Sequence, residues 1–262
     1  MTTTKTYTDQ MNREVEITQP VRRIVSIVPS QSELLADLGL RDSLAGITKF
    51  CVHPQSLKQE VQQIGGTKTL KIARILELKP DLVIGNKEEN AQADIEELEK
   101  HIPVWMSDIT DLESALEMIR CVGEITGTAE KSENMIAVIR NRFESLTTEC
   151  CSRKRLRTLY LIWRKPFMAA GKGTFIDDCL SRCGLENCLS ETRYPNADLS
   201  AVDPEVILLS SEPYPFKEKH IEELQVLFPT AKILLADGEY FSWYGSRMLG
   251  APDYFRELLA RV

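Results

Sequence analysis

The residues best suited to chemistry at close spacing are a thiol and an imidazole. Cys51 and His53 lie two positions apart, in a stretch that also contains Lys49. Both side chains bind soft metal ions, and a neighbouring cation lowers the pKa of a thiol. We therefore treat Cys51 and His53 as a candidate metal pair, with Cys51 as the one thiol expected to have a lowered pKa. A packing role for Cys51 is the alternative.

Three further cysteines cluster in the second half of the chain. Cys179 and Cys183 share one helix face, and Cys188 follows. Three thiolates could bind zinc, but the surrounding leucines favour a place in the hydrophobic core. No C-x-x-C, H-E-x-x-H, G-x-x-x-x-G-K-[ST], G-x-G-x-x-G or G-x-S-x-G motif occurs. We therefore predict no catalytic residue and no required cofactor, and consider an enzyme the less favoured class.

Composition excludes several classes of protein. The 262 residues are 43% hydrophobic and 27% charged, with a net charge of −7. This balance is typical of a globular protein, and the acidic charge argues against nucleic acid as a partner. The apolar runs are too short to insert into a membrane, and no leading secretory signal is evident. With seven cysteines, an odd number, we expect a cytoplasmic location for the sequence as it stands, or a periplasmic or lipid-anchored one if a signal was removed.

The elements that must position these residues alternate between strands and helices. Short apolar runs predict strands, and apolar residues at helical spacing predict helices. In the first half, we expect strands at 24–28, 44–47, 81–85 and 103–105, with helices at 30–38, 72–79 and 91–101. The first helix should begin with a capping box at Ser30–Glu33 and end at Gly39. Such alternation is typical of a parallel sheet covered by helices.

The second half repeats the alternation after a long helical region. Helical spacing runs from 112 to 122 and again from about 128 to 150, which is about 34 Å of helix. Strands are then predicted at 156–163, 205–209 and 232–236, with helices at 174–183, 218–228 and 245–262. The fold class is therefore α/β. We expect an N-terminal lobe over 1–125, a linking helix over 126–152 and a C-terminal lobe over 153–262, with the two Rossmann-like lobes flanking a ligand cleft.

The loops after the strands contain most of the candidate binding residues. Ligands of open parallel sheets bind at the carboxyl ends of the strands. Aromatic side chains there would stack on a ligand, and cationic ones would pair with its acidic oxygens. The predicted ligand-binding residues are Pro29, Ser30, Phe50, Cys51, His53, Thr67, Lys68, Asn86, Lys87, Trp163, Arg164, Lys165, Tyr214, Lys217, Glu239, Phe241, Trp243, Tyr244 and Arg247.

Structural roles are an alternative for several of these residues. A loop aromatic often packs on its own lobe, and Arg247 could simply pair with a nearby carboxylate. Lys87 could belong to a solvated helix start, and the segment from Tyr214 to Lys217 could be a rigid turn. The sequence therefore predicts where the site lies better than it predicts which side chains contact the ligand.

The sequence resembles the class III periplasmic binding proteins for cobalamin, ferric siderophores and haem. The resemblance runs from Arg23 to the C-terminus and rests on the segments 23–30 with 33–34, 75–84, 171–176 with 183–187, and 203–207. It implies two lobes joined by a helical backbone and a metal chelate, held as ligand, in the cleft between them. It also implies an ABC permease as partner. Where members place an acidic docking residue, however, this chain has basic residues at 71 and 74.

Three functions remain open from the sequence, the least specific of which is a cytosolic interaction module whose aromatic loops contact another protein. The first is a small-molecule binding protein resembling the substrate-binding proteins of ABC transporters. The second is an intracellular enzyme or chaperone that handles a metal or cofactor on the same scaffold. Its ligands or acid–base groups would be Cys51, His53, Glu88, Glu89, Glu212 and Glu239.

Overall fold

In the computed structural model, which describes residues 2–262, the chain divides into two units. Unit 1 comprises the chain up to Ile109, together with Glu113–Ala137 and Tyr244–Arg247. Unit 2 comprises Thr110–Leu112, Val138–Trp243 and Met248–Val262. The segment Tyr244–Arg247 was predicted with the second lobe, yet it clusters with unit 1. The ligand site that we expected two lobes to share stays a prediction.

Unit 1 is built on a five-stranded parallel sheet in the order β5-β4-β3-β8-β9. All neighbouring strands in it run parallel. Helices cover both faces of such a sheet, which explains why β3, β8 and β9 are buried along their whole length. The sequence-based prediction of a parallel α/β fold is confirmed. The strands are β3 (Ile24–Ser26), β4 (Leu44–Ile47), β5 (Gln62–Gln63), β8 (Leu82–Asn86) and β9 (Val104–Ser107).

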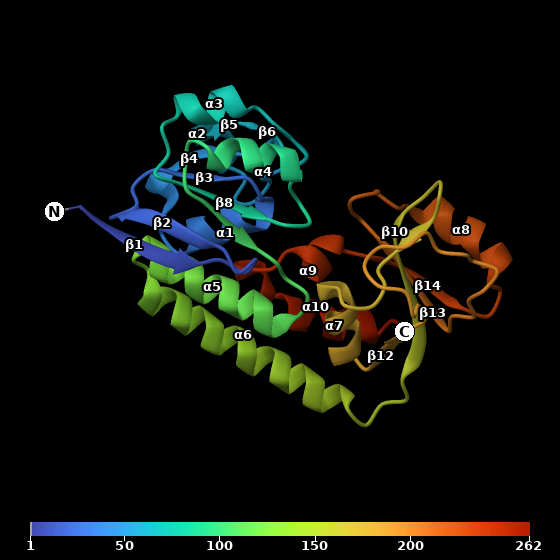
Figure 1. Ribbon diagram of the computed structural model, residues 1–262. Coiled ribbons are helices and arrows are strands. Elements are labelled where there is room, and N and C mark those ends of the chain that lie inside the picture. Colours follow the sequence, from blue (N-terminus) through green and yellow to red (C-terminus); the bar gives the residue numbers. More distant parts are fainter. Residues whose placement is uncertain (1) are drawn as a thin grey trace. The chain divides into compact units, whose positions relative to one another are not determined.

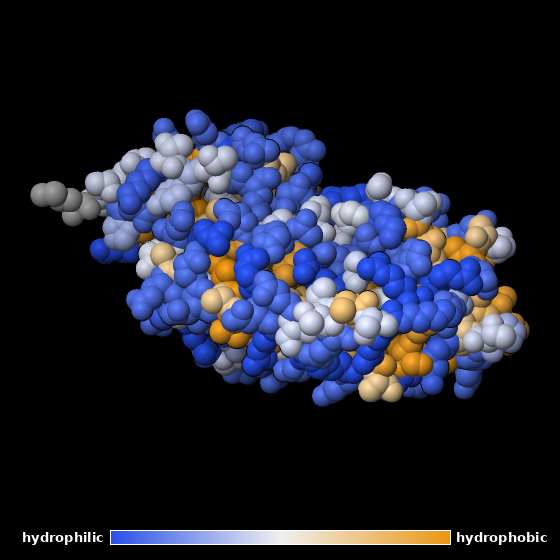
Figure 2. Space-filling view, turned by 90° about the horizontal axis from the view of Figure 1, so that it is seen from below, coloured by the Kyte–Doolittle hydropathy of each residue, from blue (hydrophilic) through white to orange (hydrophobic). Residues whose placement is uncertain are grey.

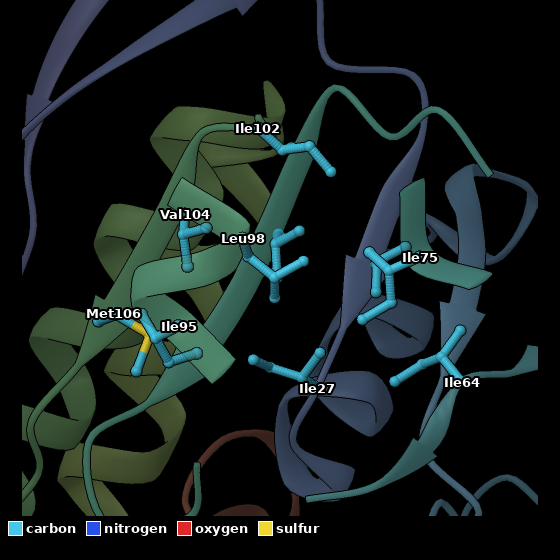
Figure 3. Close-up of a cluster of buried hydrophobic side chains, with 10 residues drawn as sticks. Ile27, Ile64, Ile75, Ile95, Leu98, Ile102, Val104 and Met106 are labelled. Carbon is cyan, nitrogen blue, oxygen red and sulfur yellow. The ribbon is translucent and has the colours of Figure 1, made fainter. Parts of the chain in front are cut away.

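Short helices follow the strands of unit 1 (Figure 1). Side chains from α3 and α4 meet those of the central strands in one hydrophobic cluster. In Figure 3, Ile75, Leu98 and Val104 point toward one another from α3, α4 and β9. This cluster fixes the sheet and hence the loops at its carboxyl end. The helices are α1 (Pro29–Asp37), α2 (Leu57–Glu60), α3 (Ile72–Glu77) and α4 (Gln92–Glu99), with a 3-10 turn η1 (Arg41–Ser43).

Helix α1 begins one residue earlier than predicted. Pro29 occupies its first turn, Val28 is the N-cap, and no side chain caps the helix. The predicted capping box at Ser30–Glu33 is therefore wrong. Proline is well suited to the first helical position because it lacks an N–H and its φ is already helical. The helix therefore begins at Pro29, one residue before Ser30. The predicted end is confirmed, since Gly39 adopts a φ of +88° just beyond α1.

Two antiparallel hairpins in unit 1 were not predicted. β1 (Thr3–Thr8) pairs with β2 (Glu14–Gln19), and β6 (Gly65–Gly66) pairs with β7 (Thr69–Leu70). The turn of the first hairpin is closed by buried Asp9, which accepts hydrogen bonds from the backbone of Met11 and Arg13 at 2.9 Å each.

Two long helices follow the first sheet. α5 (Leu112–Thr126) belongs to unit 1 from Glu113 onward, whereas α6 (Ala129–Cys150) contributes residues to both units. α6 has 22 residues, close to the predicted length. The two helices approach each other at Gly123, where an added Cβ would lie 2.0 Å from the Oγ of Ser132.

Unit 2 contains a second, mixed sheet in the order β11-β10-β13-β14, with β12 also paired to β10. β10, β13, β14 and β12 pair in parallel, and β11 pairs antiparallel to β10. In the hydrophobic core of unit 2, side chains of these strands pack against helix α8, for example against Leu224. The elements are β10 (Leu156–Trp163), β11 (Met168–Ala169), α7 (Phe175–Arg182), β12 (Leu185–Asn187), β13 (Val206–Ser210), α8 (Glu218–Leu227) and β14 (Lys232–Ala236).

The C-terminal segment differs from the single predicted helix at 245–262. It forms α9 (Gly238–Ser242), the 3-10 turn η2 (Ser246–Leu249) and α10 (Ala251–Leu259). Asp237 caps α9 by accepting a hydrogen bond from the N–H of Glu239 at 3.1 Å, and Pro252 lies in the first turn of α10. A cap and a proline each start a new helix, so the region divides.

The surface in Figure 2 is mostly hydrophilic, with only small hydrophobic patches. None of the helices within residues 2–262 combines the length and the apolar composition needed to cross a bilayer.

Candidate functional site

The loops at the carboxyl end of the unit 1 sheet rest on a buried polar framework. The side-chain amide of Asn86 donates to the backbone O of Ser107 at 3.2 Å and to its Oγ at 3.0 Å. Its Oδ1 accepts from the backbone N–H groups of Glu88 at 2.9 Å and Glu89 at 3.2 Å. Asn86 is 1% exposed. Its predicted ligand contact is corrected, because both ends of the amide hold the loop in place.

Two buried residues that we did not predict extend this framework. Asn90 donates to the carbonyl oxygens of Ile27 and Thr67, both at 3.1 Å. Gln31 donates to the Oγ of Ser107 at 2.7 Å. These amides tie the loops after β3, β6 and β8 together. The signal available in the sequence was that polar residues directly follow the apolar strand runs, but the pairing partners are far apart in sequence.

The predicted cations of unit 1 differ in which groups of the protein they already contact. Lys68 is exposed and donates to the backbone oxygens of Glu88 and Asn90. Lys87 is also exposed but forms an ion pair with Asp108. Burial raises the pKa of Glu89, and Lys68 partly offsets this effect. Lys68 is therefore better placed than Lys87 to meet an anionic group. Thr67 is 9% exposed and mainly contributes its backbone.

Phe50 is the exposed aromatic residue of the unit 1 loops. It follows β4 and is 50% exposed. The ammonium of Lys49 lies 4.9 Å from the centre of its ring. A cation over an aromatic face is a favourable but weak contact at an exposed site. The ring therefore offers an apolar surface at the carboxyl end of the sheet, as predicted, with a positive charge beside it.

Cys51 is not the reactive thiol that we predicted. It is fully buried, and its Sγ donates to the Oγ of Ser32 at 3.1 Å. Burial raises the pKa of the Cys51 thiol, so the predicted lowering is wrong: the loss of water outweighs the hydrogen bonds that Cys51 makes with Ser32 and Thr48. His53 lies in the same loop and is half-buried. Within residues 2–262, no group of three or more histidine, cysteine or acidic residues could hold a metal ion.

Arg247 pairs with a residue of helix α1. Its Nε and Nη2 donate to the two carboxylate oxygens of Glu33 at 3.0 and 2.7 Å, and each side chain is 13% exposed. Burial raises the pKa of Glu33 despite this partner. The charge of Arg247 is thus compensated inside unit 1, as in the alternative that the sequence left open, and its contact with a ligand stays a prediction. The pair also fixes the segment that contains Tyr244, which is 6% exposed. In this segment, a Cβ added at Gly245 would lie 3.4 Å from the backbone O of Ser30.

In unit 2, Trp163 is the exposed aromatic residue. It is the last residue of β10 and is 40% exposed. Its ring packs edge-on against Tyr214, with 5.7 Å between the ring centres. Arg164 pairs with Glu223 at 2.8 Å, whereas Lys165 is exposed. Trp163 and Lys165 are thus exposed and their contact with a ligand stays a prediction, whereas the charge of Arg164 is already compensated.

Tyr214 is fixed by His220 of helix α8. The Tyr214 hydroxyl lies 3.3 Å from Nε2 of His220, and Nδ1 of His220 accepts the backbone N–H of Lys217 at 2.8 Å. The pKa of His220 is lowered by burial and by the nearby Lys219 and Arg164. This turn is therefore rigid, and the exposed side chain of Lys217 extends from it.

The aromatic residues of the last loop belong mostly to the interior. Phe241 is fully buried, and its ring lies 4.9 Å from that of Tyr160 and 4.6 Å from that of Phe255. Its predicted stacking on a ligand is corrected for this structure, because Phe241 is fully buried and its ring packs on Tyr160 and Phe255. Trp243 is 7% exposed and donates from Nε1 to Glu212 at 2.8 Å. Glu239 lies in the first turn of α9 and is half-buried.

Comparison with known proteins places this arrangement in a family. Residues 24–228 match the sequence model of the periplasmic binding proteins, so the chain belongs to that family. The vitamin B12-binding protein of Vibrio cholerae serotype O1 is 27% identical over 198 residues, which are 73% of this chain and 71% of that protein. The corresponding protein of Yersinia pestis is 25% identical over 198 residues, which are 73% of this chain and 70% of that protein.

Solved structures show the same fold. The periplasmic vitamin B12 binding protein of Vibrio cholerae has a TM-score of 0.79 and 23% identity, covering 92% of this chain and 97% of that one. A periplasmic heme binding protein from Pseudomonas aeruginosa has a TM-score of 0.78 and 23% identity, covering 92% of each chain.

Proposed function

We propose that this chain is a small-molecule binding protein whose ligand is a metal chelate, with cobalamin as the first candidate. This proposal rests mainly on the exposure of the aromatic rings of Phe50 and Trp163. Among the large exposed hydrophobic residues of the described chain, these two are aromatic, and each lies at the carboxyl end of a strand. An exposed aromatic ring is a suitable surface for a large flat or apolar ligand.

The charges near these rings define the polar part of the ligand. Lys49 and Lys68 lie in the loops of unit 1, and Lys165 and Lys217 in those of unit 2, and all four are exposed. Such ammonium groups are suited to phosphate or carboxylate oxygens. Cobalamin contains a phosphate, and haem and ferric siderophores contain acidic oxygens, so each of the three classes fits the loops.

The relatives support cobalamin as the first ligand to test. The proteins of Vibrio cholerae and Yersinia pestis that match across 73% of this chain are named vitamin B12-binding proteins. We expect this chain to carry its ligand rather than to use it as a cofactor. Delivery to an ABC permease and the location of this protein stay predictions. Lys71 and Arg74 are positively charged, so a docking surface that includes them would have the opposite charge to one built from acidic docking residues.

Titration of the full chain tests this proposal. The protein is titrated with cyanocobalamin, haemin and ferrichrome while tryptophan fluorescence and heat are recorded. We expect saturable binding of one of them, with a Kd of about 1 µM or tighter. Absence of saturation with all three would show that the ligand is not a metal chelate of these classes.

A pair of variants tests which side chains bind. Trp163→Ala removes the exposed ring of unit 2 and is expected to weaken binding about tenfold. Val226→Ala is the matched control, because Val226 is 79% exposed but lies on helix α8. Equal affinities of the two variants would contradict the role of Trp163.

A further inference from the structure

Unit 1 contains a polar hollow that lies outside the proposed ligand loops and includes Arg74, which was considered above only in relation to docking. It has a volume of about 440 Å³ and is lined by residues of helix α2, helix α3 and the edge strand β5. Figure 1 labels these three elements in unit 1. Its lining includes Lys58, Arg74 and three glutamines, Gln59, Gln62 and Gln63. A volume of this size lies within the range of small-molecule sites, although the lining here is polar rather than apolar.

The two cations in this hollow are not compensated. Lys58 and Arg74 are half-buried, and within residues 2–262 neither forms an ion pair. The acidic residue of the lining, Glu60, is already engaged by Arg41, whose Nε donates to Glu60 at 2.8 Å. Unpaired charges that are partly removed from water are costly, and an anion that binds between them would offset that cost.

We propose that this hollow is a binding site for a phosphate group. A guanidinium presents two parallel N–H donors that match two phosphate oxygens, and an ammonium adds a second positive charge. The glutamine amides can donate to the remaining oxygens. Two cations match the charge of a phosphate group, which is about −1.5 to −2 near neutral pH, better than they match the single charge of a carboxylate.

The group can come from free inorganic phosphate or from a phosphate ester. The volume exceeds what a phosphate alone needs, so an ester leaves room for its organic part. The site does not depend on the proposed chelate function, because none of its residues belongs to the loops that contain Phe50 or Trp163.

Binding of inorganic phosphate, glycerol 3-phosphate and acetate to the full chain tests the proposal. We expect calorimetry or phosphorus NMR to show saturable binding of one or both phosphates, and weaker binding of acetate. Tighter binding of the ester would identify an ester as the occupant, and tighter binding of inorganic phosphate would identify the free ion. Saturation by neither phosphate, or equal binding of acetate, overturns the proposal.

Variants locate the binding in the hollow. Arg74→Gln and Lys58→Gln should each weaken phosphate binding about tenfold, the loss of one charge-assisted hydrogen bond. Glu60→Gln should strengthen it about threefold by removing a negative charge, a gain that misfolding cannot produce. The control is Lys5→Gln, which removes a cation from the exposed strand β1. Unchanged affinity in both Arg74→Gln and Lys58→Gln, or an equal loss in Lys5→Gln, overturns the assignment to this hollow.

Discussion

Glu33 and Arg247 are 214 positions apart in the chain, yet they form a bidentate ion pair inside unit 1. The sequence left open whether Arg247 contacts a ligand or pairs with a carboxylate, because it cannot reveal a partner so distant. The same applies to Arg164, whose partner Glu223 belongs to helix α8. At the scale of single residues, the sequence therefore predicts which side chains have useful chemistry but not which of them are already paired.

The Glu33–Arg247 pair leads to an asymmetric prediction. Because burial raises the pKa of Glu33 even with its partner present, removing the cation should cost more than removing the carboxylate charge. We expect Arg247→Gln to lower the free energy of unfolding by about 2 to 3 kcal/mol near neutral pH, and Glu33→Gln by about 1 kcal/mol. Urea unfolding of both variants and of the double variant measures this difference.

The pH dependence of the destabilisation by Arg247→Gln provides a control. A carboxyl whose pKa is raised on folding contributes stability below its unfolded pKa, and that stability is lost as pH rises through the folded value. The loss of unfolding free energy caused by Arg247→Gln should therefore become smaller when pH falls toward the range in which Glu33 is protonated. A deficit that grows in acid, or a larger cost for Glu33→Gln at neutral pH, would contradict this account.

His220 should make unit 2 less stable in mild acid. Its pKa is lowered from the ordinary value of 6.5, with burial as the largest cause. The unfolded chain therefore binds the proton first, and stability is lost as pH falls below about 6.5 and through the folded-state pKa. His220→Asn keeps an acceptor for the N–H of Lys217 without titrating in this range. The difference in Tm between about pH 7.5 and about pH 5 should be smaller in this variant. A difference equal to that of the unchanged protein would show that His220 is not the group responsible.

At the scale of elements, apolar runs predicted the strands of both parallel sheets well. β10 and β14 have the predicted bounds, and β3 and β8 differ by only one or two residues at their ends. The β1–β2 hairpin was missed because only β2 alternates between exposed and buried residues, whereas β1 is exposed along almost its whole length. The helix at 245–262 was divided by Pro252, a start signal that apolar spacing alone does not detect.

The close approach of α5 and α6 depends on Gly123. A Cβ added there would lie 2.0 Å from Oγ and 2.6 Å from Cβ of Ser132, and Ser132 is fully buried. Gly123→Ala gains helix propensity but overpacks this contact, so we expect a net loss of about 1 to 2 kcal/mol in the free energy of unfolding. Thermal or urea unfolding measures it.

A second substitution at the same contact provides the control. Ser132→Gly removes the atoms that the new methyl group would meet. The double variant Gly123→Ala, Ser132→Gly should therefore be less destabilised than the sum of the two single changes. Additive losses would show that the two helices do not restrict each other at this point.

At the scale of the whole molecule, the sequence predicted an α/β chain with two sheets and a long helix, and the family membership agrees with that fold. The candidate site was predicted less completely. Phe50 and Trp163 are exposed at strand ends as expected, whereas Phe241, Asn86 and Cys51 are buried. Loop position alone could not separate these groups, since burial depends on how each loop folds back on its unit.

The most direct test of the central claim is a calorimetric titration of the full chain with cyanocobalamin and haemin, repeated with Trp163→Ala, Phe50→Ala and Val226→Ala. The account predicts saturable binding by the unchanged protein and by Val226→Ala, and about tenfold weaker binding by both aromatic variants. Binding that is unaffected by the loss of either ring, or no binding of any metal chelate by the unchanged protein, would contradict it.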